Sequence, residues 1–151
     1  EYGIEADVDS DCAPLWGTVE SIYSVTDDIH VIRDATRGGV GTVLYEIASQ
    51  SNVGIKLETA KIPVADGVKG VCGMLGLEPL YLACEGRLVI FAPQDKAEKI
   101  VEVLRQGKYS KNAAIIGTVT EENKGRVVME TEIGSQTLLP QPGGELLPRI
   151  C

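Results

Sequence analysis

The chain has 151 residues, of which 44% are hydrophobic and 24% are charged, and its formal net charge is −8. A chain of this size and composition can bury a core without disulfides or metals, so we expect one soluble globular domain. Its 14 lysines and arginines are scattered, which excludes nucleic acid as a partner, and no apolar run approaches the roughly 18 residues that a membrane span needs.

The spacing of apolar residues alternates along the chain between the helical period and the strand period. We expect Ser10 and Asp11 to cap the first helix, with Ile22 and Tyr23 on its apolar stripe, and Pro93 to open the last helix. The predicted elements in chain order are a helix over 13–25, a strand over 29–33, a helix over 38–50, a strand over 53–58, a helix over 64–75, a strand over 87–91, a helix over 95–105, and strands over 113–119, 126–131 and 136–139.

The order of these elements indicates the fold class. Helices cross between strands in the first half of the chain, and hairpins dominate the second half. The continuous apolar run over 87–91 predicts a strand that is covered on both faces. We therefore expect an α+β fold in which one mixed sheet is covered by helices.

The cysteines and the single histidine do not suggest a metal site. No two of the four cysteines form a CxxC pair, and His30 is the only histidine, so we predict no metal ligands, no disulfide framework and a reducing cytoplasm. Cys12 and Cys72 are expected to be small buried side chains. His30 is expected to be an ordinary strand or surface residue.

A glycine pair follows the predicted strand over 29–33. The sequence there is Asp34-Ala35-Thr36-Arg37-Gly38-Gly39, at the amino end of a predicted helix. Backbone N–H groups at such a helix start can approach an anion, and an arginine adds a forked donor, so this loop is a candidate phosphate site. The alternative is that Asp34 or Thr36 simply caps the helix.

Glu85 is a candidate general base. It lies between Cys84 and Gly86, immediately before the apolar strand, where partial desolvation would raise the pKa of its carboxyl group. The alternative is a solvated glutamate in a turn. Cys84 is expected to be structural.

The end of the chain carries a thiol. Residues 140–151 are rich in proline and glycine, so we predict a flexible tail that ends in Cys151. Twelve steps from Leu139 allow a reach of roughly 40 Å. A terminal thiolate is a nucleophile that can carry a chemical group, and Arg149 would modestly favour its ionised form. The alternative is a frayed terminus with an incidental cysteine.

Four segments carry a resemblance to a known family. They are residues 34–39, the run 77–81 leading to Glu85-Gly86, the segment 114–117, and the closing Pro148-Arg149-Ile150-Cys151. Together they resemble the carboxy-terminal portion of the hydrogenase maturation protein HypE family, of the PurM or AIR synthetase superfamily. The related synthetases and kinases of that superfamily share the core but lack the tail.

The resemblance implies an AIR synthetase-like C-terminal domain over 1–139, lacking its start, and a tail over 140–151. It further implies an absent amino half that holds most of the ATP and magnesium site and the homodimer contact, so the fragment alone would be inactive. The implied activity is that of a cytoplasmic carbamoyl dehydratase. A carbamoyltransferase would load the terminal cysteine, ATP would drive dehydration to a thiocyanate, and an iron-carrying hydrogenase assembly scaffold would receive the cyanide.

The resemblance also assigns roles to residues. Cys151 and Glu85 would be catalytic, and Pro148, Arg149 and Ile150 would position the tail. The phosphate-binding residues would be Asp34, Thr36, Arg37, Gly38 and Gly39. Two positions depart from the family pattern, which more often has proline at Ala35 and asparagine at Cys84. Two other functions stay open: a non-catalytic thiol carrier or docking module, and a domain of a sibling ATP-dependent synthetase.

Overall fold

A computed structural model describes residues 9–131 and 133–141, so the predictions made for Pro148, Arg149, Ile150 and Cys151 fall outside the described residues. The described helices are α1 (Trp16–Tyr23), α2 (Gly39–Ser51), α3 (Asp66–Leu75) and α4 (Gln94–Leu104), with short 3₁₀ turns η1 (Thr59–Lys61) and η2 (Pro79–Tyr81). The described strands are β1 (Val31–Asp34), β2 (Gly54–Glu58), β3 (Leu88–Phe91), β4 (Gly117–Thr120), β5 (Val127–Glu130) and β6 (Gln136–Leu138).

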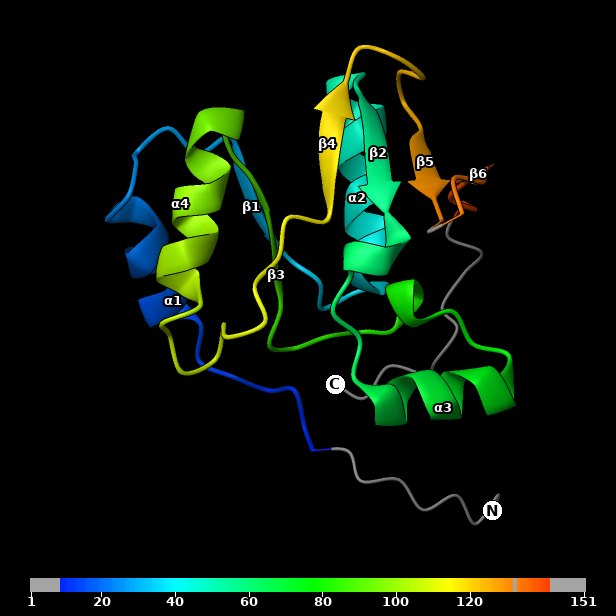
Figure 1. Cartoon of the computed structure of the whole chain (residues 1–151), viewed down its shortest axis with the longest axis horizontal. Coiled ribbons are helices and arrows are strands. Elements are labelled where there is room, and N and C mark those ends of the chain that lie inside the picture. The colour runs from blue at the N-terminus through cyan, green and yellow to red at the C-terminus, as the bar shows by residue number, and fades with distance from the viewer. Residues whose placement is uncertain (1–8, 132, 142–151) are drawn as a thin grey trace.

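The described strands form two sheets rather than the single sheet expected. β1 and β3 form an antiparallel pair, and the other four lie in the order β4-β2-β5-β6. The larger sheet is mixed, because β2 pairs with β5 in parallel and with β4 antiparallel. Figure 1 shows α1 and α4 beside the small sheet and α2 behind the large one, so the expected α+β class with helices covering a mixed sheet is confirmed.

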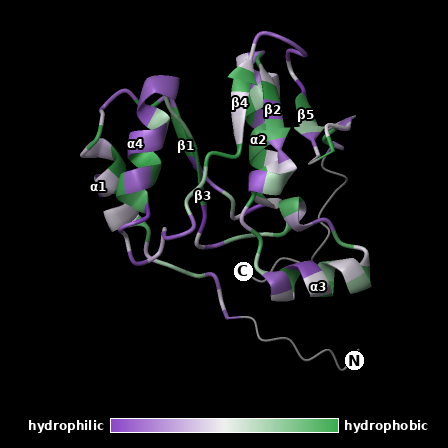
Figure 2. Cartoon of the chain, in the orientation of Figure 1, coloured by the Kyte–Doolittle hydropathy of each residue, from purple (hydrophilic) through white to green (hydrophobic). Residues whose placement is uncertain are grey.

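The larger of two apolar clusters lies between α2 and the four-stranded sheet. Val43, Leu44, Ile47 and Ala48 recur at helical spacing and form the buried face of α2. Its other buried members are Ile55, Leu57, Leu80, Val89, Val127 and Leu139. Figure 2 shows hydrophobic residues on α2 and on the strands in front of it, and also on β1 and β3.

A smaller cluster lies between α1, α4 and the two-stranded sheet. Ile22, Ile100 and Leu104 are buried there. Alternate residues of β3 reach different clusters, because Val89 packs in the larger one and Ile90 against the smaller one. The prediction that this strand is covered on both faces is therefore confirmed, although Val89 is buried and the other three residues are only half-buried.

Four local predictions were wrong: the start of the first helix, the burial of Cys12, the place of Tyr23 on the apolar stripe, and the bounds of the strand over 113–119. The first helix begins at Trp16, and its N-cap residue Leu15 makes no side-chain capping bond, while the Ser10 hydroxyl instead accepts from the Cys12 N–H at 3.3 Å. Cys12 is exposed rather than buried, and Tyr23 is exposed too. The strand predicted over 113–119 covers only Gly117–Thr120. Two other predictions are confirmed, because Cys72 is buried and His30 is exposed.

Candidate functional site

The glycine pair shapes the junction between β1 and α2. Gly38 is the N-cap of α2 in the left-handed conformation, with φ 65°, and no side chain makes a capping bond there. The alternative that Asp34 or Thr36 caps this helix is therefore wrong. The first N–H groups of α2 are left without a side-chain partner from the described residues, which is the condition an anion site at a helix start requires.

Asp34 and Thr36 interact with each other instead. A hydrogen bond from the Thr36 side chain is the main cause that holds the pKa of the exposed Asp34 carboxyl below its usual range. The carboxylate is thus ionised at neutral pH, and it repels a phosphate. Asp34 is suited to shaping the loop, whereas Arg37 and the backbone N–H groups remain as candidate phosphate donors.

A cavity of ≈ 330 Å³ opens beside this loop. It is lined by Arg33, Asp34, Thr36, Arg37, Thr42, Val43 and Glu46. Arg33 and Glu46 form an ion pair with 3.0 Å between Nη2 and Oε2, which ties β1 to α2. The Thr42 hydroxyl is buried and has no hydrogen-bond partner among the described residues. Sequence reasoning missed Arg33, Thr42 and Glu46, although the four-residue spacing of the last two on α2 is a detectable signal.

Close backbone packing joins this loop to η2. Gly39 also has φ 65°, and a Cβ there would lie inside the van der Waals radii of the Leu80 and Leu82 carbonyl oxygens. A Cβ at Gly41 would press into the Tyr81 ring. The start of α2 therefore rests directly on the segment that leads to Glu85.

Two backbone hydrogen bonds centred on Ala35 bring the two predicted sites together. The Ala35 N–H donates to the Arg87 carbonyl at 3.2 Å, and the Cys84 N–H donates to the Ala35 carbonyl at 3.1 Å. Ala35 itself is fully buried. The turn that carries Glu85 is thus fixed beside the phosphate loop, which sequence spacing alone does not reveal.

The local surroundings of Glu85 differ from those expected. Glu85 is exposed in a turn, which matches the alternative of a solvated turn glutamate, so the described residues do not shield its carboxylate from water. The neighbouring Cys84 is half-buried, and its thiol donates to the Leu82 carbonyl at 3.2 Å. Burial is the main cause that raises the pKa of this thiol, which supports the structural role predicted for Cys84.

Residues 6–130 match the family model described as AIR synthase related protein, C-terminal domain. The chain belongs to this AIR synthase related family. It is also similar to the carbamoyl dehydratase HypE of Azotobacter vinelandii, with 43% identity over 149 residues, which cover 99% of this chain and 44% of that protein. The chain thus spans less than half the length of the HypE relatives it matches.

Solved structures agree with this AIR synthase related assignment. The chain is similar to the hydrogenase maturation protein HypE solved in complex with ATP, with a TM-score of 0.90, 44% identity and coverage of 99% of this chain and 46% of that one. It is similar to HypE in a HypE–HypF complex, with a TM-score of 0.88, 39% identity and coverage of 93% and 46%. The resemblance to the HypE family expected from the sequence is confirmed.

The last residue before the predicted tail and the first residue of the tail are held against the AIR synthase related domain. Leu139 is buried, its N–H donates to the Val127 carbonyl at 2.8 Å, and the Tyr81 hydroxyl donates to the Pro140 carbonyl. These contacts hold the departure point of residues 141–151 against η2, the segment on which the start of α2 rests.

The described part of this AIR synthase related domain offers no evident metal ligands. Within residues 9–131 and 133–141, no three His, Cys, Asp or Glu side chains are grouped in a way that could hold a metal ion. No helix in the same residues is both long and apolar enough to cross a bilayer.

Proposed function

We propose that this chain is the C-terminal domain of an ATP-dependent carbamoyl dehydratase of [NiFe]-hydrogenase maturation. The observation that carries the proposal is the pair of hydrogen bonds at Ala35, because they hold a helix start suited to phosphate beside the turn that carries Glu85. The HypE similarity supports the reaction class, since relatives over 99% of this chain bear the name carbamoyl dehydratase.

In the proposed reaction the Cys151 sulfur first receives a carbamoyl group, giving a thiocarbamate, S–C(=O)–NH₂. The carbonyl oxygen then attacks the γ-phosphorus of ATP, ADP leaves, and one N–H proton is lost. In the second step the C–O bond breaks, phosphate leaves with its electron pair, and the second N–H proton is removed. The products are a thiocyanate on Cys151, ADP, phosphate and the two protons.

The residues of the site have separate tasks in these steps. Phosphorylation is needed because an amide oxygen is a poor leaving group, and catalysis of phosphoryl transfer depends mainly on positioning and charge. Arg37 and the N–H groups that follow Gly38 orient the phosphates, and the Thr36 hydroxyl joins them only when it turns from Asp34. Glu85 accepts the amide protons. Because Glu85 is exposed in this domain, the bound tail and the rest of the protein must exclude water during the reaction.

The covalent length of the chain limits how far Cys151 can lie from Pro140. Eleven residue steps separate it from Pro140, which is held by Tyr81, and they span at most about 36 Å at 3.3 Å per residue. We assign residues 1–139 to the domain and 140–151 to the tail. Pro148, Arg149 and Ile150 would seat the tail while the sulfur is dehydrated.

The remaining components lie outside this chain. We propose that ATP and magnesium are held mostly by the portion of the HypE relatives that this chain does not match. A HypE–HypF complex is known for a relative, so a HypF-type carbamoyltransferase is the proposed donor. The cyanide would pass to an iron-carrying scaffold, and the full-length protein would form a homodimer. Alone, these 151 residues would not turn over ATP.

Intact mass spectrometry of the full-length protein tests this function. After incubation with the carbamoyl donor, the terminal peptide gains a carbamoyl group, and adding ATP removes the mass of one water from it. A thiol carrier, the competing function, would gain the carbamoyl group but never lose water. A sibling synthetase would keep its full activity after deletion of Cys151.

A further inference from the structure

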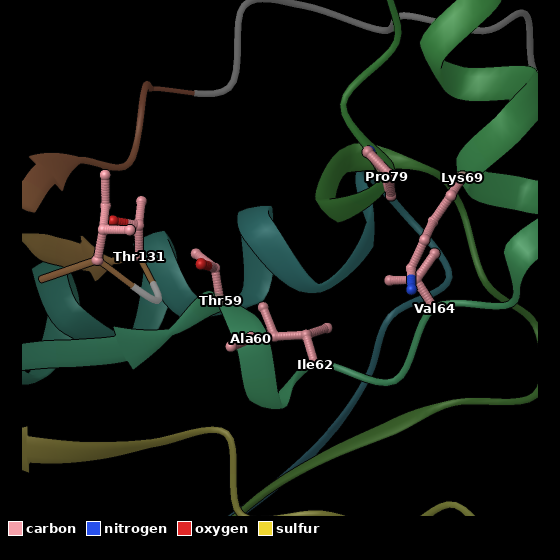
Figure 3. A pocket seen from close by; sticks show the side chains of 8 residues that line it. Thr59, Ala60, Ile62, Val64, Lys69, Pro79 and Thr131 are labelled. Atoms are coloured by element: carbon pink, nitrogen blue, oxygen red, sulfur yellow. The ribbon is translucent and has the colours of Figure 1, made fainter. Parts of the chain in front are cut away.

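A second cavity, of ≈ 500 Å³, lies between η1, α3, η2 and the segment that follows β5. It is lined by Thr59, Ala60, Ile62, Val64, Lys69, Pro79, Thr131 and Ile133, which we call the α3 groove. Figure 3 shows Thr131 at one end and Lys69, Val64 and Pro79 at the other. The groove thus combines apolar side chains with the Thr59 and Thr131 hydroxyls and one cationic side chain, and the proposed dehydration does not use it.

The predicted tail begins beside this groove. Tyr81 holds the Pro140 carbonyl, and Tyr81 and the groove residue Pro79 are the two ends of the same three-residue turn η2. Leu139 is fixed in the core by its burial and its hydrogen bond to Val127. The chain beyond residue 140 therefore starts next to one wall of the groove.

The sequence of the tail matches the chemistry of the groove. Residues 145–147 are Glu-Leu-Leu, which provide two apolar side chains and one anion. Lys69 has only a weak partner among the described residues, because its contact with Asp66 is 3.4 Å long and both side chains are largely exposed, at 60% and 99%. Six residue steps from Pro140 to Leu146 span at most about 20 Å, and two of the intervening residues are glycines.

We propose that Glu145, Leu146 and Leu147 dock in the α3 groove of their own chain, with Glu145 paired to Lys69. Docking leaves only the last four residues free, and these extend at most about 13 Å beyond the groove. This docking does not depend on the chemistry at Cys151 and stands or falls separately from the proposed function.

Methyl NMR on the whole 151-residue chain tests the docking. Nuclear Overhauser contacts are expected between the methyl groups of Leu146 or Leu147 and those of Ile62 or Val64. Leu146→Ala lowers the docked-to-undocked ratio about tenfold, because burying a leucine side chain is a large share of the docking free energy. Leu138→Ala is the matched control, since Leu138 is 49% exposed and lies outside the groove.

The ion pair is tested by charge exchange. Lys69→Glu lowers the docked-to-undocked ratio about two- to fivefold, as expected for an exposed pair, and adding Glu145→Lys restores it. Lys124→Glu, at an exposed pair with Glu121, leaves the ratio unchanged.

Three results overturn the docking: no methyl contacts in the intact chain, contacts only between differently labelled copies, or no rescue by the exchanged pair. If a Cys151→Ala chain still shows the methyl contacts, that result supports the docking independently of the dehydratase chemistry.

Discussion

Replacing Gly39 by alanine tests how tightly the phosphate loop rests on η2. Gly39 has φ 65°, and a Cβ would overlap the carbonyl oxygens of Leu80 and Leu82, which belong to the backbone and cannot rotate away. The left-handed conformation costs alanine about 1–2 kcal/mol. Forcing an atom into close packing adds about 1–3 kcal/mol. We therefore expect Gly39→Ala to lower the free energy of unfolding by about 2–5 kcal/mol.

Gly76→Ala is the matched control for this prediction. Gly76 has φ 67°, but a Cβ there meets no atom within 4 Å, so only the conformational cost of about 1–2 kcal/mol applies. Urea unfolding of both variants measures the difference. Equal losses for Gly39→Ala and Gly76→Ala would refute the close approach of the loop to η2. In the full-length protein, Gly39→Ala should also weaken ATP-driven dehydration, whereas Gly76→Ala should not.

Three further predictions concern stability and reactivity. Gly73 lies inside α3, and a Cβ there meets nothing within 4 Å, so Gly73→Ala should raise the free energy of unfolding by about 0.5–1 kcal/mol. A lower free energy of unfolding, measured with urea, would contradict the described α3. In a Cys151→Ala chain, iodoacetamide should modify exposed Cys12 before Cys84, whose thiol pKa is raised by burial; mass spectrometry showing the reverse order would contradict the described burial. Because the Asp34 pKa is lowered in the folded state, its ionised form stabilises the protein above the ordinary aspartate pKa, and this stabilisation is lost as the pH falls through the lowered value. The difference in free energy of unfolding between wild type and Asp34→Asn should therefore shrink below about pH 4. A difference that grows there would mean that the pKa of Asp34 is raised, not lowered, by folding.

The sequence predicted most of the elements because their apolar residues follow clear periods. In α2 the spacing of Val43, Leu44 and Ile47 matched one buried face, and the glycine pair marked its start correctly. The first helix was misplaced because Ser10 and Asp11 resemble a cap, but the chain from Ser10 to Leu15 is not helical. Local cap chemistry predicts a helix start only when the following residues adopt helical geometry.

The division into two sheets could not be predicted, because strand pairing depends on contacts between distant segments. β2 pairs with β5 across about 70 residues, and no pattern within either strand names its partner. The same limit applies to the site. Spacing identified the loop at Gly38 and the turn at Glu85 separately, whereas their union rests on two backbone hydrogen bonds at Ala35 that no side-chain pattern encodes.

The rate at which the terminal thiocarbamate loses water, measured in a single turnover of the full-length protein with ATP, tests the central claim most directly. We predict that Glu85→Gln slows this step by about 100-fold or more, as expected for loss of a general base, while Glu98→Gln on the exposed face of α4 leaves it unchanged. Dehydration by Glu85→Gln at the wild-type rate would contradict the account, because the turn that the structure holds beside the phosphate loop would then have no part in the chemistry.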